Sequence, residues 1–78
     1  MFYTYVLRSK RDQKLYVGFT DNLKNRLEKH NKGLSLATRN RLPVELGYYE
    51  ASVSKEKALK REKYFKTGFE RKFLKNRI

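Results

Sequence analysis

The sequence predicts one small α+β domain spanning residues 1–78. Two runs of β-branched and aromatic residues between Phe2 and Thr20 flank the polar segment SKRDQ, a pattern typical of a β-hairpin. A third run of this kind follows a proline, and two further segments combine cap residues with helical spacing of apolar side chains. With 38% apolar residues, six tyrosines and five phenylalanines, the chain can fill one compact core, whereas its length excludes a second domain.

The register of the hairpin follows from the separation of apolar and polar side chains. Successive side chains of a strand point to opposite faces, and pairing Ser9 with Lys14 gathers the apolar residues on one of them. That face, the expected core face, carries Phe2, Val6, Leu15, Val17 and Phe19, with Thr4 and Arg8 as polar exceptions. The other face carries Tyr3, Tyr5, Tyr16, Gly18 and Thr20.

Two phenol hydroxyls share the second face of the hairpin. In this register Tyr5 lies diagonal to Tyr16 and opposite Gly18, whose missing side chain leaves room for a ring. Tyrosine also favours strands and tolerates half-burial without any catalytic role. The hairpin alone therefore leaves a structural and a functional interpretation open.

A helix of about ten residues is expected in DNLKNRLEKHNKG, with Asp21 as its N-cap and Gly33 at its end. The stripe that should face the sheet consists of Leu23, Leu27 and His30. Arg26 lies four residues before His30 and borders this stripe. Taken singly, Arg26 could be a surface side chain whose stem covers apolar atoms, and His30 could be a hydrogen-bonded structural residue.

Residues 33–42 show no sustained period and are expected to form an irregular connection. Its polar residues Thr38, Arg39, Asn40 and Arg41 could contact phosphates or could simply form solvated loop surface. Pro43 then begins a third strand, since proline is tolerated at the first position of a strand. In this strand Val44, Leu46 and Tyr48 alternate with Glu45, Gly47 and Tyr49. The alternation predicts that one side of the strand joins the core.

A second helix is expected in KEKALKREKYFK, capped by Ser54 and ended by Gly68. Its predicted apolar face consists of Ala58, Leu59 and Phe65. Glu62 falls inside this face, where a carboxylate is costly unless it is paired or bound to a metal. The structural alternative is a salt bridge from Glu62 to Arg26 or to a neighbouring lysine. Residues 69–78, with Phe69, Phe73 and Leu74, predict a short last helix.

The chain is strongly basic, with 20 Lys and Arg against 8 Asp and Glu and a net charge of +12. This excess favours nucleic acid as partner, because neutralising phosphates releases counterions. An acidic protein or an anionic membrane surface is the alternative, but the basic residues are spread along the chain instead of lying in one lipid-facing helix. The absence of cysteine excludes disulfides, thiolate zinc sites and cysteine nucleophiles. With no apolar run of about 18 residues and no signal peptide, a cytoplasmic location is expected.

The tyrosines, Arg26 and Glu62 together would suffice for phosphodiester hydrolysis. A carboxylate can hold a hard divalent ion with most of its waters, and an arginine can offset charge that develops on a phosphate. A phenol near both can orient or deprotonate water. A phenol with its ordinary pKa of about 10 is a poor base, and adjacent positive charge is expected to favour the ionised form.

These residues resemble the GIY-YIG nuclease family, and the resemblance covers nearly the whole chain. The counterparts of the family's two triplets, at the expected separation, are Tyr3-Thr4-Tyr5 and Tyr16-Val17-Gly18. The chain is most similar to small standalone bacterial members, which have segments like TRNRLPVEL and ALKREKY. The resemblance implies a three-stranded antiparallel sheet flanked by helices. It also implies cleavage of DNA that depends on Mg²⁺ or Mn²⁺, in a setting such as DNA repair or recombination.

The same resemblance implies a role for each matched residue. Tyr5 would be the general base or its helper, Tyr16 would orient the attacking water, Arg26 would stabilise phosphate charge, His30 would support the site or a proton transfer, and Glu62 would bind the metal. Tyr3 departs from the first glycine of the family, at a position that contributes backbone. Asn76 is the only candidate for a further asparagine seen in some members, and its context does not match.

The expected nucleic-acid surface combines Arg39, Arg41, Lys60 and Arg61 around the tyrosine face. Since no extra domain for target choice is visible, a protein partner could supply specificity. The alternative function is a module of the same fold that grips DNA or RNA without cutting it.

Overall fold

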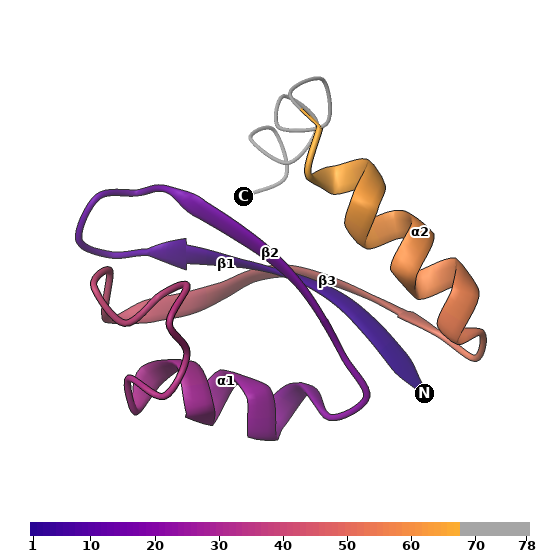
Figure 1. The fold of residues 1–78 in the computed structure, drawn as a ribbon, viewed down its shortest axis with the longest axis horizontal. Helices are drawn as coiled ribbons and strands as arrows, with labels where there is room; N and C mark the ends of the chain where they lie inside the picture. The colour runs from indigo at the N-terminus through magenta and orange to yellow at the C-terminus, as the bar shows by residue number, and fades with distance from the viewer. Residues whose placement is uncertain (68–78) are drawn as a thin grey trace.

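The computed structural model describes residues 1–67, which form a three-stranded antiparallel sheet and two helices. In chain order the elements are β1 (Phe2–Ser9), β2 (Leu15–Thr20), α1 (Leu23–Asn31), β3 (Val44–Ser52) and α2 (Lys55–Phe65). The strand order is β2-β1-β3, so the first strand is central. The helices lie on opposite sides of the sheet (Figure 1). The predicted α+β fold is confirmed, while the expected last helix, Gly68 and Asn76 lie outside the described residues.

The hairpin has the predicted register. Tyr5 pairs with Gly18 and Val6 with Val17, and the Ser9 amide donates to the Lys14 carbonyl at 2.9 Å. At the turn the Ser9 hydroxyl accepts hydrogen bonds from two following amides and donates to the carbonyl of Arg41 at 2.7 Å. The hairpin turn is thereby tied to the connection that precedes β3.

Both faces of the sheet belong to the core, not only the face that the pattern of the hairpin favoured. On one face Val6 and Val17 pack against Phe65 of α2. On the other, Tyr5, Leu7 and Val44 form a second cluster with Leu23 and Leu27 of α1 around it. The tyrosine face is therefore covered by α1, and Tyr5 is only 2% exposed.

The predicted alternation of β3 is wrong, because the strand contains a bulge. Leu7 of β1 pairs with Leu46, but the neighbouring Val6 pairs with Tyr48, which leaves Gly47 as an extra residue. An extra residue reverses the alternation beyond it. Leu46 consequently packs in the cluster under α1, whereas Tyr48 packs against Phe65 in the cluster under α2.

The two helices begin at side-chain caps. The N-cap of α1 is Asn22, not the predicted Asp21, and its side chain accepts the amide of Asn25 at 3.1 Å. Gly33 follows α1 with a φ of +76°, the left-handed conformation expected just beyond a helix end. The predicted cap of α2 is confirmed, since Ser54 accepts the amide of Lys57 at 3.2 Å.

The face that α2 turns to the sheet differs from the predicted one at Leu59. Ala58 and Phe65 are buried, but Leu59 is 40% exposed. Arg61 instead packs its guanidinium 4.5 Å from the centre of the Phe65 ring and donates two hydrogen bonds to Glu50 of β3, at 2.8 and 2.9 Å. A further tie runs from the hydroxyl of Thr4 to the carbonyl of Ala58 at 2.6 Å, which explains a polar residue on this core face.

Candidate active site

The ring of Tyr5 lies over Gly18, as the hairpin register predicts. A β-carbon built at Gly18 would lie 2.9 Å from Cε1 of that ring and closer still to its Cζ and hydroxyl oxygen. Contacts this short do not occur in folded proteins, so only glycine leaves space for the ring at this position. Gly18 thus fixes where the phenol of Tyr5 sits.

A chain of buried hydrogen bonds leads from this phenol into the protein. The Tyr5 hydroxyl is 3.1 Å from Nε2 of His30, and Nδ1 of the same ring is 2.6 Å from the hydroxyl of Thr38. All three side chains are buried. Thr38 is therefore neither a phosphate contact nor solvated loop surface, the two possibilities the sequence leaves open, because its hydroxyl is turned inward to the histidine.

Tyr16 forms the outer part of the same aromatic cluster. Its ring meets that of His30 edge to face, with centres 5.3 Å apart, and is tilted relative to that of Tyr5, with centres 6.5 Å apart. Tyr16 is half-buried and lines a hollow of about 430 Å³ together with Arg41 and Lys66. A solvent-facing phenol thus stands beside the buried one, at a hollow with two cationic side chains.

Charged groups from both helices act on the Tyr5 phenol. Burial raises its pKa above the ordinary value, and nearby Tyr16 and Glu62 raise it further, whereas Arg26 lowers it. Arg26 favours the ionised form, as expected of an adjacent positive charge, but burial outweighs this effect and the net pKa of Tyr5 is raised. Burial and Arg26 also lower the pKa of His30, so its ring is uncharged near neutral pH.

Arg26 and Glu62 differ in their exposure and in their protein partners. Arg26 is exposed, and within residues 1–67 its guanidinium forms no hydrogen bond or ion pair. Glu62 is half-buried, with its side chain 23% exposed, and its carboxylate lies 3.3 Å from Nζ of Lys66. Glu62 thus pairs with a neighbouring lysine, Lys66, which is one form of the salt bridge that the sequence leaves open as the structural alternative. Arg26 stays available for another anion.

The carboxylate of Glu62 fits a weakly held, largely hydrated divalent ion. The described part of the chain contains no group of three His, Cys, Asp or Glu side chains able to enclose a metal. Mg²⁺ needs no such cage, since it usually keeps several waters and binds one or two carboxylates together with substrate phosphates. Lys66, the present partner of Glu62, is on an exposed stem and can move aside.

The structure does not bring the four expected nucleic-acid contacts into one surface. Arg41 lines the hollow beside Tyr16, and Arg39 is exposed in the same connection. Lys60 and Arg61 line a different hollow between α2 and β3. Arg61 is held there by Glu50, whose pKa its hydrogen bonds lower, and Lys60 pairs with Glu56 at 3.3 Å.

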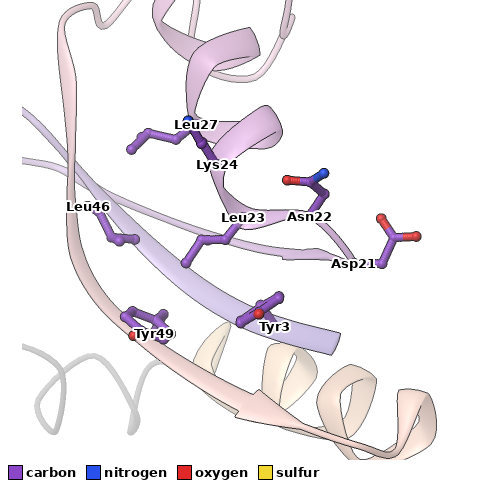
Figure 2. A pocket seen from close by; sticks show the side chains of 8 residues that line it. All are labelled: Tyr3, Asp21, Asn22, Leu23, Lys24, Leu27, Leu46 and Tyr49. Atoms are coloured by element: carbon purple, nitrogen blue, oxygen red, sulfur yellow. The ribbon is translucent and has the colours of Figure 1, made fainter. Parts of the chain in front are cut away.

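A groove between the start of α1 and the sheet is separate from the aromatic cluster of Tyr5, Tyr16 and His30. Its volume is about 590 Å³, and Figure 2 shows Leu23 of α1 directed toward the sheet, with the rings of Tyr3 and Tyr49 on neighbouring strands. The other lining residues are Asp21, Asn22, Lys24, Leu27 and Leu46. None of the five candidate catalytic residues lines it.

Two neighbours of the site, Lys66 and Thr38, are not predicted from the sequence. Lys66 lies four residues after Glu62, a spacing that places the two on one helix face and could have suggested the pair. Thr38 carries no comparable signal, because its contact with His30 spans an irregular connection whose path no local pattern predicts.

This geometry coincides with a family match over the same residues. The model of the GIY-YIG catalytic domain matches residues 1–76. The chain belongs to the GIY-YIG family. The GIY-YIG domain is a nuclease-type catalytic domain, and the resemblance seen in the two tyrosine triplets is confirmed.

The GIY-YIG proteins similar to this chain include several small bacterial ones. A UPF0213 protein of Bacillus licheniformis is 49% identical over 65 residues, which cover 82% of this chain and 66% of that protein. A UPF0213 protein of Clostridium perfringens is 45% identical over 67 residues, covering 85% and 71%. The chain thus spans just under two thirds of the first relative's length.

A solved structure shares the fold. The solution NMR structure of a UPF0213 protein from Bacillus halodurans matches with a TM-score of 0.60 and 32% identity, covering 97% of this chain and 84% of that one. Within residues 1–67 no helix is both long and apolar enough to cross a membrane.

Proposed function

We propose that this GIY-YIG protein is an endonuclease that hydrolyses phosphodiester bonds of DNA with the help of a divalent metal ion. One observation carries the proposal: the buried phenol of Tyr5 lies beside Tyr16 and His30, with ring centres 6.5 and 6.0 Å away. The charges of Arg26 on α1 and Glu62 on α2 both act on the pKa of this phenol. A structural tyrosine needs only a hydrogen-bond partner, which His30 already provides. The convergence of a carboxylate, a second phenol and a cation that has no partner within residues 1–67 supports phosphate chemistry instead.

The side chains divide the work of hydrolysis according to their exposure. Arg26, exposed and without a protein partner in residues 1–67, binds the phosphate and offsets the charge that grows on it during attack. Tyr16, at the solvent side of the cluster, orients the attacking water. Tyr5, hydrogen-bonded to His30, accepts the proton of that water when its phenol is ionised, and Arg26 favours the ionised form.

Within the described residues, Glu62 would be the one carboxylate that holds the metal ion. Bound there, a divalent ion supplies positive charge next to the phosphate and lowers the pKa of coordinated water. Arg39 and Arg41 extend the positive potential beyond the cleaved linkage, since both lie in the connection beside Tyr16. Lys60 and Arg61 would contact nucleic acid only on a second surface.

The test is nicking of supercoiled plasmid DNA in Mg²⁺ and, separately, in Mn²⁺. We expect the parent to nick, and Arg26→Ala and Glu62→Gln to slow nicking by about 10²-fold, the usual effect of removing one electrostatic contribution to the transition state. Matched controls remove the same charges from the same helices at exposed positions: Lys29→Ala on α1 and Glu56→Gln on α2. Both controls should nick at close to the parental rate.

Two results would contradict the proposal. Equal nicking by the parent and by Arg26→Ala and Glu62→Gln would show that the activity does not come from this site. Salt-sensitive gel shifts of DNA or RNA without any nicking would favour a binding module of the GIY-YIG fold, since counterion release alone explains such binding.

The raised pKa of Tyr5 predicts how the nicking rate depends on pH. Because burial holds this phenol neutral near neutral pH, the ionised fraction, and with it the rate, should rise steadily from about pH 7 to about pH 9. Tyr5→Phe should remove most of the activity and flatten the remaining profile, whereas Tyr16→Phe should lower the rate but keep the rise. A parental rate that falls over this range would contradict a role of Tyr5 as base.

A further inference from the structure

Two tyrosine rings line the sheet side of the groove between the start of α1 and the sheet. Tyr3 of β1 and Tyr49 of β3 meet edge to face, with ring centres 6.1 Å apart, and Figure 2 shows both rings at the groove. Tyr3 is half-buried, and Tyr49 is 51% exposed. The proposed hydrolysis uses neither ring, although a concave site lined by aromatic side chains is typical of ligand binding.

The helix side of the groove is aliphatic. Leu23 and Leu27 of α1 line it there, and Figure 2 shows Leu23 directed toward the sheet. The charged residues of the lining are Asp21 and Lys24, whose opposite charges offset each other. The groove, about 590 Å³ in volume, therefore suits a flat, uncharged group that can stack on an aromatic ring, and not an isolated anion.

The surroundings of the groove favour a ligand that also carries negative charge. The chain has a net charge of +12, and the exposed Arg26 follows Leu23 by three residues on α1. A nucleic-acid strand has both properties, since its phosphates are charged whereas its bases are flat and uncharged. A nucleobase is thus the occupant whose chemistry matches both the groove and its surroundings.

The groove lies on the sheet face that carries the candidate catalytic phenol. Tyr49 is the direct partner of Tyr5 in the register of β3 with β1. Tyr3 precedes Tyr5 by two residues on β1, so their side chains share a face and their backbone positions lie about 7 Å apart along the strand. A DNA strand whose phosphate contacts Arg26 beside Tyr5 can therefore place a neighbouring base against Tyr49.

We propose that this groove is a subsite for an unpaired nucleobase of the bound DNA strand, stacked on the ring of Tyr49 and in contact with Leu23 and Leu27. Every base has a face that can stack, so the subsite selects an unpaired nucleotide and no particular sequence. A base inside a duplex is stacked between its neighbours and has to leave the helix to enter. The place of this base next to the cleaved linkage rests on the proposed function, whereas its binding does not.

Binding is measured in EDTA, so that no metal is present and no strand is cut. Fluorescence anisotropy compares a short labelled oligothymidine with an abasic strand of the same length and charge. We expect the parent to bind the oligothymidine about tenfold more tightly, within the range that stacking of one base contributes. Equal affinities for the two strands would overturn the proposal.

Three variants locate this difference on the protein. Tyr49→Ala should lower the affinity for oligothymidine about tenfold and leave the affinity for the abasic strand unchanged. Tyr49→Phe keeps the ring and should bind as the parent does. Tyr64→Ala removes an exposed ring from α2, on the other side of the sheet, and should also bind as the parent does. An equal loss for both strands in folded Tyr49→Ala would contradict stacking at this position.

The salt dependence of binding separates contacts to bases from contacts to phosphates. The slope of log affinity against log salt concentration reports the number of neutralised phosphates. Tyr49→Ala should therefore lower the affinity for oligothymidine by the same factor at every salt concentration and keep the parental slope. A shallower slope in this variant would mean that phosphate contacts were lost and would count against a base in the groove.

An NMR measurement on the parent needs no variant. A thymine base in the groove should give intermolecular NOEs between its protons and the methyl groups of Leu23 and Leu27, and their absence at saturating oligothymidine would overturn the proposal. A parent that shows these NOEs but does not nick plasmid would refute the proposed function and leave the subsite in place. A parent that nicks but lacks the NOEs would refute the subsite alone.

Discussion

Replacing Phe65 by alanine should lower the free energy of unfolding by about 3–5 kcal/mol, the range found when buried phenylalanines are truncated. Phe65 is 0% exposed and packs against Val6 and Val17 of the sheet. Its ring also meets Tyr48 edge to face, with ring centres 6.0 Å apart. A loss of this size is a large part of the total stability of a domain this small. Urea unfolding followed by circular dichroism measures it.

The matched control for Phe65 is Leu59→Ala on the same helix. Because Leu59 is on the solvent side of α2, its truncation should change the unfolding free energy by less than about 1 kcal/mol. Helical spacing alone would predict that both substitutions remove core contacts. Equal losses for the two variants would contradict the packing described here, in which Phe65 and Ala58, not Leu59, attach α2 to the sheet.

Local patterns predicted the hairpin and its register, because both are determined by neighbouring residues. The alternation of side chains and the short polar turn leave one pairing that separates apolar from polar faces, and this pairing puts Tyr5 opposite Gly18. The family membership could be recognised for the same reason, since its two triplets lie on these paired strands.

The sequence could not predict features that depend on distant partners. The bulge at Gly47 arises from the pairing of β3 with β1, and a single extra residue turned Tyr48 to the opposite face from Leu46. On α2, Arg61 takes a place against Phe65 because Glu50 on β3 neutralises its charge there. Neither partner is visible within the local period of the helix or strand.

The protonation state of the site was equally beyond local patterns. The residue types predict positive charge near Tyr5 and hence an easier ionisation of its phenol, but the opposing effect of burial depends on how α1 and Gly18 enclose the ring. His30 was recognised as a candidate, yet its two partners, Tyr5 and Thr38, come from segments far apart in the chain. The chemistry of the site is thus determined by tertiary structure more than its residue types suggest.

Gly18→Ala should damage stability and activity together. The added methyl group would overlap the end of the Tyr5 ring, and overpacking of this kind typically costs about 1–3 kcal/mol. The ring can escape only by leaving its position beside His30 and Tyr16, and a misplacement of about 1 Å at a reacting group can lower a rate about 10²-fold. Urea unfolding and plasmid nicking of the same preparation measure the two effects.

A double-mutant cycle attributes the loss to the ring and not to the strand. In a Tyr5→Leu background the overlapping atoms are absent, so adding Gly18→Ala should cost less than about 0.5 kcal/mol beyond the Tyr5→Leu change itself. If alanine at position 18 were equally costly in both backgrounds, its effect would belong to the backbone of β2. The glycine of the second triplet would then serve strand geometry and not the placement of the Tyr5 phenol, and the link between the hairpin register and the candidate active site would fail.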